Sequence, residues 1–593
     1  MNKSFDNIRH SSIGTVEFVS PKEIKVILET DAPQSTSLNT GVPQLFPRIN
    51  GILLIPNEAG ALIGMITWIG IEYSPYPKRK GYKDFDLVDL PFPLRKLYLS
   101  PLGILKEKDG NYEIERGVYS YPSVGDIVIV PSQEQLKAIV QNKDKNAGIK
   151  IGVAPMAANA PVFVDPDKLF GRHLALLGNT GSGKSCSVVG LIRWSIETAK
   201  FSLKIGNSVN ARFIIFDPNG EYGNCFNDLG NVKRYEVKIN TENNDNQQKL
   251  VEKEENNKTD LNEDVKNDND SKQLKVPSWM WSSWEWASIT QASAKTQIPV
   301  IKNCLIEQRN NNNNDQLYDE DTPVFFIQKE LIDRIKQSSI IKQEYNKSFL
   351  MRLDMLQKDS RVKSVIDGEQ NQTLENWLNE YIGSNDKNPS ITIIDLSLLP
   401  SEILFLVVSV MGRIIFEAHH RYKKQTGQTL PTVLVVDEAH NLIKRYELED
   451  DNISSQRLCT QIFEKIAKEG RKFGIGLVLA SQRPSELSQT VLSQCNTFLL
   501  HRIVSDRDQE MVKKLVPDTM GGILNELSVL PSRKAILLGW ATPIPVLVEM
   551  NELPEDQRPK SKDPEFWNVW INEEKRESVW KEIVNDWQQN KND

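Results

Sequence analysis

The sequence of 593 residues is poor in cysteine and lacks any spacing that would pair its thiols. Its five cysteines are scattered and form no Cys-x-x-Cys motif, which argues against a disulfide framework or a common structural zinc site. No apolar run approaches the roughly 20 residues that cross a bilayer, and the polar first residues lack the apolar core of a signal peptide. We therefore expect a soluble, cytoplasmic protein without a membrane segment.

An excess of positive charge is also absent. The formal net charge is −7 and the isoelectric point is about 5.7, so the surface as a whole is not that of a polyelectrolyte-binding protein. A local basic channel remains compatible with this composition, because the field near a site matters more than the total charge. The length predicts two or more domains, each with a substantial core.

One glycine-rich motif stands between two apolar segments. It consists of Gly178, Asn179, Thr180, Gly181, Ser182, Gly183, Lys184 and Ser185. The run 173–177 predicts a strand before it and the run 188–192 predicts a helix after it, which is the setting of a phosphate-binding loop. Its backbone N–H groups would form an anion-binding nest at the helix N-terminus. Lys184 would reach the β- and γ-phosphates of ATP, and Ser185 would bind Mg²⁺.

Three later apolar runs end in polar residues. Asp437 and Glu438 follow the run 433–436, which predicts that Asp437 holds the Mg²⁺ shell and Glu438 orients or deprotonates the attacking water. Gln482 follows the run 476–480 and is a candidate contact to the γ-phosphate or to that water. Asp217 and Glu221 follow a third run. They are candidate nucleotide-binding residues because ligands bind at the carboxyl ends of parallel strands, although a turn also uses such residues for geometry alone.

Composition divides the chain into five parts and predicts an α/β fold. Strands alternating with helices predict a parallel sheet, short β-like runs predict a small barrel or sandwich, and a segment without apolar residues predicts a flexible insertion. The parts are residues 1–160 (small β-barrel), 161–240 with 388–550 (ATPase core), 241–275 (polar insertion), 276–387 (helical insertion) and 551–593 (C-terminal brace or tail).

Two further features have competing interpretations. The segment 277–286 contains four tryptophans, which are suited to stacking on nucleic-acid bases but more often pack a core or an interface. The segment 441–446 contains Lys444 and Arg445. We interpret it either as a loop that contacts DNA phosphates or as a solvated turn.

Together these motifs resemble the HerA ATPases of the FtsK/HerA group, over nearly the whole chain. The resemblance rests on the phosphate-binding loop, on the sequences at 217–222 and 437–440, and above all on Ser-Gln-Arg-Pro at 481–484. It implies an N-terminal HAS-type barrel, a RecA-like P-loop core with a helical insertion, and a homo-hexamer that threads double-stranded DNA. It also implies that Gln482 is a sensor of the γ-phosphate and that Arg172 and Arg471 act in the site of a neighbouring subunit.

The resemblance implies an ATP-dependent DNA translocase or helicase that works with a partner nuclease or a sirtuin-like effector, in DNA end processing or phage defence. The alternative is an ATP-gated ring scaffold that assembles and regulates an effector with little movement along DNA. DNA-stimulated ATP turnover would distinguish the two. A conjugative or secretion coupling ATPase is disfavoured, because it predicts an N-terminal membrane segment that this sequence lacks.

Overall fold

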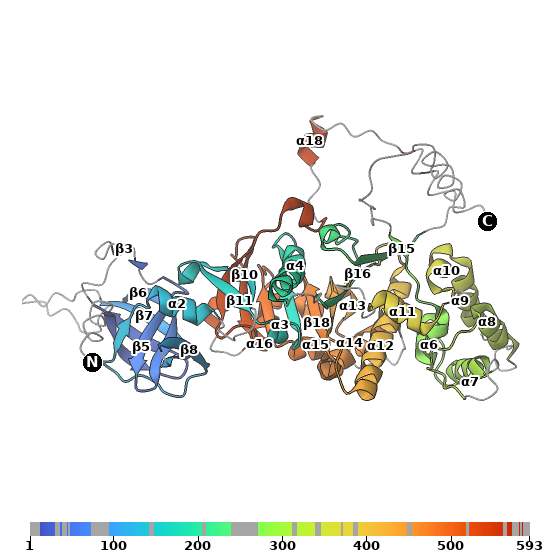
Figure 1. Ribbon diagram of the computed structural model, residues 1–593, viewed down its shortest axis with the longest axis horizontal. Coiled ribbons are helices and arrows are strands. Elements are labelled where there is room, and N and C mark those ends of the chain that lie inside the picture. The colour runs from blue at the N-terminus through green and yellow to red at the C-terminus, as the bar shows by residue number, and fades with distance from the viewer. Residues whose placement is uncertain are drawn as a thin grey trace, which may run out of the picture. The chain divides into compact units, whose positions relative to one another are not determined.

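The computed structural model describes most of the chain as two compact units (Figure 1). The described residues are 12–29, 36–37, 44–45, 48–72, 94–108, 110–141, 148–203, 209–238, 271–310, 317–338, 346–368, 372–383, 390–446, 454–516, 521–560, 566–571, 580 and 584. The first unit comprises Met1–Val209, Tyr422–Arg445 and Phe463–Pro554, and the second comprises Asn210–Arg421, Tyr446–Ile462 and Glu555–Asp593. Within the described part, no helix is both long and apolar enough to cross a membrane.

The first unit begins with a closed antiparallel β-barrel, as the sequence predicts. Its strands run in the order β2-β1-β9-β5-β6-β7-β8, and a pairing of β2 with β7 closes the barrel while β8 lies outside it. The bounds are β1 (Ser12–Val19), β2 (Ile24–Leu28), β5 (Ile52–Asn57), β6 (Gly60–Glu72), β7 (Leu94–Lys108), β8 (Asn111–Arg116) and β9 (Ile127–Ile129), with a separate pair β3 (Thr36–Ser37) and β4 (Gln44–Leu45). Alternate residues of β2 are buried, which fits a strand that turns one face to a core.

The large sheet begins earlier in the sequence than the expected boundary at residue 161. After α2 (Gln133–Val140), β10 (Ile149–Ala154) and β11 (Ala160–Val164) form a hairpin, and β10 pairs with β21 of the ATPase sheet. The barrel strands end at Ile129. The hairpin covers an edge that would otherwise expose unpaired backbone groups, and composition alone did not distinguish it from the barrel strands.

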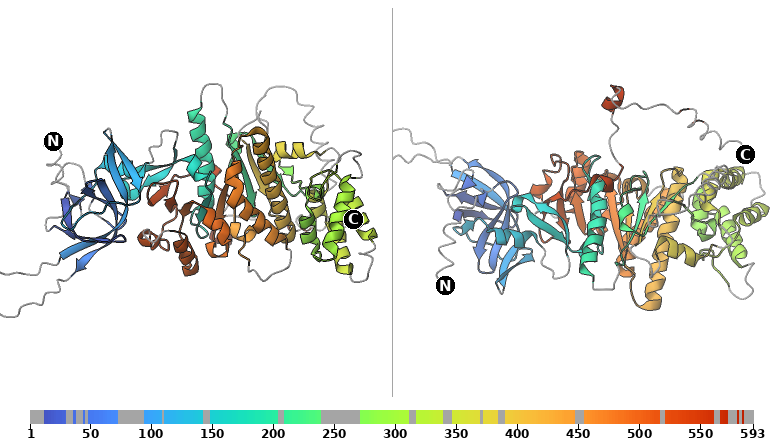
Figure 2. Two further views of the ribbon diagram at one scale, coloured as in Figure 1. Left: turned by 90° about the horizontal axis from the view of Figure 1, so that it is seen from below. Right: turned by 45° about the horizontal axis from the view of Figure 1, so that its top comes forward.

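In the first unit the large sheet has the order β11-β10-β21-β20-β19-β12-β18-β17. The central strands are parallel and almost entirely buried, as expected for strands with both faces covered. Figure 2 shows α4 lying along this sheet, where it packs on β10, β12 and β18. The strands are β12 (Leu174–Leu177), β17 (Thr432–Val436), β18 (Ile475–Ser481), β19 (Thr497–Leu500), β20 (Lys534–Gly539) and β21 (Val546–Met550). The helices are α3 (Pro166–Leu169), α4 (Lys184–Ser202), α13 (Ala439–Leu442), α15 (Gln489–Gln494), α16 (Asp506–Leu515) and α17 (Gly521–Leu524), with the 3₁₀ turns η5 (Gly470–Phe473) and η6 (Pro484–Glu486).

The second unit contains four parallel strands in the order β13-β16-β14-β15, and a group of helices inserted between β15 and β16. The strands are β13 (Arg212–Asp217), β14 (Val232–Glu236), β15 (Lys272–Gln273) and β16 (Ser390–Asp395). The helices are α6 (Ser283–Thr290), α7 (Gln297–Asn310), α8 (Gln328–Gln337), α9 (Lys347–Lys358), α10 (Ser360–Ile366), α11 (Leu374–Tyr381), α12 (Ser401–Thr426), α14 (Ser455–Glu469), which continues into the first unit, and α18 (Phe566–Trp570). The helical insertion is thus present, whereas most of the expected polar insertion 241–275 lies outside the described residues.

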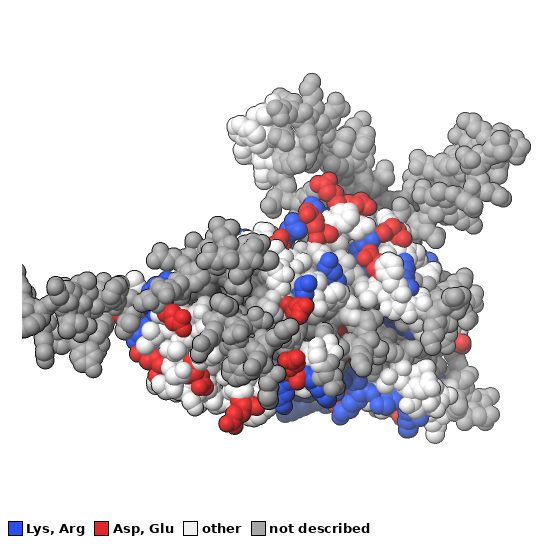
Figure 3. All heavy atoms as spheres, turned by 60° about the vertical axis from the view of Figure 1, so that its left-hand side comes forward, with Lys and Arg blue, Asp and Glu red and all other residues white. Residues whose placement is uncertain are grey.

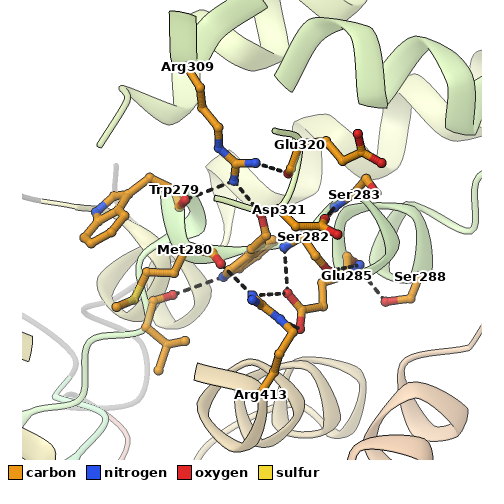
Figure 4. Close-up of polar contacts among 12 residues, drawn as sticks. Trp279, Met280, Ser282, Ser283, Glu285, Ser288, Arg309, Glu320, Asp321 and Arg413 are labelled. Atoms are coloured by element: carbon orange, nitrogen blue, oxygen red, sulfur yellow. Dashed lines mark hydrogen bonds and ion pairs between the residues drawn. The ribbon is translucent and has the colours of Figure 1, made fainter. Parts of the chain in front are cut away.

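Three of the four clustered tryptophans belong to the core of the second unit. Trp279, Trp281 and Trp286 are at most 1% exposed, and the rings of Trp281 and Trp286 have centroids 4.9 Å apart. The buried Arg309 donates to the backbone carbonyls of Trp279 (3.2 Å) and Trp281 (2.8 Å), as Figure 4 illustrates for the first of these contacts. These contacts favour core packing over base stacking for these three residues. Trp284 differs, because its side chain is 43% exposed.

Candidate active site

Strand register brings the predicted ATPase residues to one edge of the sheet in the first unit. Leu177 pairs with Ser481 between β12 and β18, and Val436 pairs with Leu479 between β17 and β18. The phosphate-binding loop, the Asp437–Glu438 pair and Gln482 therefore follow three adjacent parallel strands at their carboxyl ends. This is the edge at which open α/β sheets bind ligands.

The phosphate-binding loop depends on backbone conformations that favour glycine. Gly181 has φ = 70° and Gly183 has φ = 97°, both in the left-handed region that L side chains rarely adopt. A Cβ atom on Gly178 would lie 2.5 Å from the Cβ of His501, so no side chain fits there. The loop leads directly into α4 at Lys184, and the helix dipole therefore favours an anion at this position.

Lys184 is buried between the two predicted carboxylates. Its Nζ lies 3.8 Å from Oδ1 of Asp437 and 3.6 Å from Oε1 of Glu438, and all three residues are at most 5% exposed. Glu438 has φ = 42°, a left-handed conformation that is costly for a non-glycine residue and typical of functional positions. A buried ammonium needs such compensation. Triphosphate oxygens would supply the same negative charge to Lys184.

Gln482 connects the phosphate-binding loop to Glu438. Its Oε1 accepts from Oγ1 of Thr180 at 2.5 Å, and its Nε2 donates to Oε1 of Glu438. His440, which the sequence analysis left without a role, has its Nδ1 3.2 Å from the other carboxylate oxygen of Glu438. Burial lowers the pKa of His440, which favours the neutral ring. Gln482 thus holds the predicted water-activating carboxylate through Oε1, whereas its buried Oε2 has no hydrogen-bond partner among the described residues.

The donor set fits Mg²⁺ and ATP. Hydroxyl and carboxylate oxygens are the ligands that Mg²⁺ prefers, and Ser185 in the first turn of α4 and Asp437 after β17 provide them. The glycine conformations and the helix N-terminus provide the anion cradle. These residues would hold the metal and the phosphates, and the metal would neutralise the charge that develops on the transferred phosphoryl group.

Asp217 and Glu221 lie in the second unit, where Asp217 organises its own loop. Its Oδ1 accepts from the backbone N–H of Asn219 (3.2 Å) and Gly220 (2.9 Å), and its Oδ2 accepts from that of Tyr222 (2.9 Å). Oε1 of Glu221 accepts from Nδ2 of Asn219 at 3.4 Å. These bonds account for the Asp-Pro-Asn-Gly pattern as turn chemistry. Binding of nucleotide by Asp217 and Glu221 stays a prediction.

Arg172 and Arg471 lie at the opposite edge of the sheet from the phosphate-binding loop of their own chain. Arg172 precedes β12, and Arg471 lies in η5 before β18. The strand β18 separates Arg471 from Gln482 by roughly 20 Å at about 3.3 Å per residue, so neither guanidinium reaches the loop of its own chain. The guanidinium of Arg172 lies 4.0 Å from the ring centroid of Trp540, and that of Arg116, at the end of β8, lies 5.7 Å from the same ring.

His501 and the turn before β20 were not predicted from the sequence. His501 is fully buried behind Gly178, and burial, with a smaller effect of Lys184, lowers its pKa to about 4. Oγ of Ser532 donates to the carbonyl of Gly181 at 3.3 Å. These residues support the side of the loop that faces the protein. No local motif marks them, because their role arises from the pairing of β19 with β12.

Comparison with known proteins shows what this chain is similar to. Residues 149–415 match the family model described as "Helicase HerA, central domain". The DNA double-strand break repair helicase HerA of Pyrococcus furiosus is 26% identical over 469 residues, covering 73% of this chain and 74% of the relative. The protein of the same name from Sulfolobus acidocaldarius is 25% identical and covers 79% and 80%. The structure of VirB4 of Thermoanaerobacter pseudethanolicus is 15% identical, with a TM-score of 0.44, over 70% of this chain and 99% of that one.

The division of roles between Lys184 and Glu438 gives a first prediction. Lys184→Ala removes the only ammonium between the two described carboxylates and should abolish ATP binding, as measured by calorimetry. Glu438→Gln keeps the shape of the side chain and its amide can still contact Gln482, so ATP should bind while hydrolysis stops. Wild-type turnover by Glu438→Gln would show that this carboxylate does not act on water.

His501 gives a prediction about acid stability. Its folded pKa of about 4 lies below the ordinary value of about 6.5, so the unfolded chain binds the extra proton first. The contribution of His501 to the free energy of unfolding is complete above pH 6.5. This contribution decreases by about 3 kcal/mol in all as the pH falls toward 4. Urea unfolding of His501→Gln should therefore depend less on pH in this window than unfolding of the wild type. His420→Gln, at a half-exposed site, is the matched control and should keep the wild-type slope.

Proposed function

We propose that this member of the HerA helicase family, a P-loop ATPase, hydrolyses ATP with Mg²⁺ to move double-stranded DNA through a homo-hexameric ring in the cytoplasm. The observation that carries the proposal is the bridge from Thr180 through Gln482 to Glu438. A group in this position would contact the γ-phosphate when ATP is bound and would lose this contact on hydrolysis. Its loop is therefore suited to report the state of the nucleotide.

Hydrogen bonds lead from the Gln482 loop to the basic segment at 441–446. The backbone N–H of Arg445 donates to the carbonyl of Glu486 at 2.8 Å, and that of Ser488 donates to the carbonyl of Ile443 at 3.0 Å. Lys444 also forms an antiparallel bridge with Leu487. A shift of Gln482 on hydrolysis would thus move Lys444 and Arg445. This connection supports the interpretation of the segment as a DNA-contacting loop.

Charge distribution also supports contact with DNA. The chain as a whole is acidic, yet Figure 3 shows Lys and Arg side chains gathered along the lower edge of the drawn face, while Asp and Glu are scattered over the rest. Arg445 is exposed, and Lys444 is partly exposed. A ring would repeat such a loop six times and concentrate positive charge around the duplex.

We propose that Arg172 and Arg471 complete the site of the neighbouring subunit. Their distance from the loop of their own chain leaves them available to a second copy. Trp540 would hold the guanidinium of Arg172 in place by a cation–π contact, and its backbone N–H is fixed to the carbonyl of Asn496 at 2.9 Å. The backbone N–H of Asn496 in turn donates to the carbonyl of Arg172 at 3.1 Å. Trp540 and Arg172 are therefore connected through the backbone of Asn496.

The partner is proposed from the family. The relatives in Pyrococcus and Sulfolobus are named as double-strand break repair helicases, which supports a role in DNA end processing with a partner nuclease. A sirtuin-like or other effector, in phage defence, is the second candidate partner. The alternative function is an ATP-gated ring that assembles and regulates such an effector with little translocation.

The trans arginines give a third prediction. Arg172→Ala and Arg471→Ala should each lower kcat strongly, toward the ~10³–10⁵-fold effect of arginine fingers, with little change in ATP affinity. Trp540→Ala should lower kcat less, and Trp540→Phe should restore it because an aromatic face remains. Mixing Arg172→Ala with Lys184→Ala protomers should recover part of the turnover. A fully active monomer would contradict the composite site.

DNA-stimulated ATP turnover gives a fourth prediction and tests the translocase against the scaffold. Duplex DNA should raise the turnover of the wild type, and replacing Lys444 and Arg445 together with Ala should reduce this stimulation while basal hydrolysis survives. The slope of log affinity against log salt should become shallower, because fewer phosphate contacts release fewer counterions. Lys424→Ala, which removes an exposed lysine of the first unit, should leave the slope unchanged. Absence of any stimulation by DNA would favour the scaffold.

A further inference from the structure

A pocket lies in the second unit, between α6, α12 and the first half of α14. Its volume is about 560 Å³, within the range of small-molecule sites. It is lined by Ser282, Trp284, Glu285, Ala294, Asp321, Ser409, Arg413, Ser454, Arg457, Leu458, Gln461 and Ile462. None of these residues belongs to the phosphate-binding loop, so the ATPase chemistry leaves the pocket unexplained.

Most of the charge on one wall of the pocket is already neutralised. Glu285 accepts from Nε and Nη2 of Arg413, both at 2.9 Å, and from the backbone N–H of Ser282 at 2.7 Å (Figure 4). Arg413 also donates to the carbonyl of Met280 at 2.6 Å. This ion pair is structural, and its carboxylate has no unmet demand for a cation. Asp321 accepts from the backbone N–H of Ser283 at 3.2 Å.

One turn before Arg413 on α12, the pocket has a hydrogen-bonding group without a protein partner among the described residues. Ser409 is 1% exposed, and its Oγ has no hydrogen-bond partner among the described residues. A buried hydroxyl without a partner is costly, so Ser409 is suited to a ligand that enters the pocket. The N-terminus of the 15-residue helix α14 lies at the same pocket through Ser454, whose Oγ accepts from the backbone N–H of Arg457 at 3.2 Å. The helix dipole and Arg457 favour an anionic group there.

Trp284 adds an aromatic surface. It is the exposed member of the tryptophan cluster, at 43%, and it lines the pocket. Nζ of Lys302 lies 5.2 Å from its ring centroid, which holds the indole by a cation–π contact. Leu458 and Ile462 provide apolar contact on α14. A flat ring can stack on Trp284 while its polar edge meets Ser409.

We propose that this pocket binds a nucleobase attached to a phosphate, with the base on Trp284 and Ser409 and the phosphate at the start of α14 beside Arg457. A nucleobase attached to a phosphate can come from two sources, namely a free nucleotide or an unpaired nucleotide at a DNA end. Recognition of an unpaired base would give the chain a sensor of DNA ends that is separate from its ATPase residues.

The test uses the full-length Lys184→Ala protein, so that the phosphate-binding loop does not contribute. AMP is titrated by calorimetry in one arm, and in the other arm a duplex with a single-stranded overhang that ends in 2-aminopurine is followed by fluorescence. At least one probe should bind saturably, with one site per chain. Trp284→Ala should weaken this binding about 5- to 150-fold, as expected for loss of base stacking. Ser409→Ala should weaken it about 2- to 10-fold through loss of one hydrogen bond.

The controls separate this site from other binding. Trp567→Ala removes a tryptophan that is 68% exposed outside the pocket and should have no effect. Ala294→Phe, at an exposed residue of the pocket lining, should block the pocket while thermal unfolding shows an intact fold. Binding of AMP alone assigns the site to free nucleotides, and binding of the overhang alone assigns it to DNA ends. The proposal is overturned if neither probe binds, or if Trp284→Ala and Ala294→Phe bind as tightly as the parent. Residual binding at the phosphate-binding loop would give this second result.

Discussion

The burial of one ammonium between two carboxylates is the constraint on which the active site depends. Lys184, Asp437 and Glu438 are all nearly inaccessible to water, and removing the ammonium of Lys184 would leave two carboxylates without a countercharge in a region of low dielectric. The three residues come from two strands that are not neighbours, since β18 lies between β12 and β17. The strand order and register of the sheet must therefore be fixed before the charges can balance.

The intervening strand explains why Gln482 has a central position. Because β18 pairs with both β12 and β17, the first residue after it lies between the phosphate-binding loop and the Asp-Glu pair. A side chain at this position must accept a hydrogen bond on one side and donate a hydrogen bond on the other. Gln482 does so, with Thr180 on one side and Glu438 on the other, whereas a carboxylate in its place would repel Glu438.

The sequence was sufficient for the features that local patterns encode. The glycine-rich motif, the apolar run ending in Asp-Glu and the run before Gln482 predicted three segments that lie at the ends of adjacent strands, while their roles in catalysis stay predictions. The alternation of strands and helices predicted the α/β class, and short β-like runs predicted the barrel. Features created by distant pairing were not predictable. His501 has no motif of its own and is important only because β19 lies beside β12, and the hairpin β10–β11 resembles the barrel in composition but joins the other sheet. Trp279 and Trp284 are equivalent in the sequence, yet one is 1% and the other 43% exposed, because only the three-dimensional packing determines which face of the segment is covered.

The two edges of the central sheet have different chemistry, and this difference bears on assembly. The carboxyl-terminal edge carries the anion cradle and its carboxylates, while the amino-terminal edge carries Arg172 and Arg471. A strand separates the two edges within one chain, so in the proposed assembly the arginines of one copy would meet the cradle of another copy. An interface between unlike surfaces can repeat from each subunit to the next. It forms a closed ring when the rotation that relates neighbouring subunits adds up to a full turn. The support of Arg172 by Trp540, and the contact of Arg116 with the same ring, would then connect the barrel of one subunit to hydrolysis in the next.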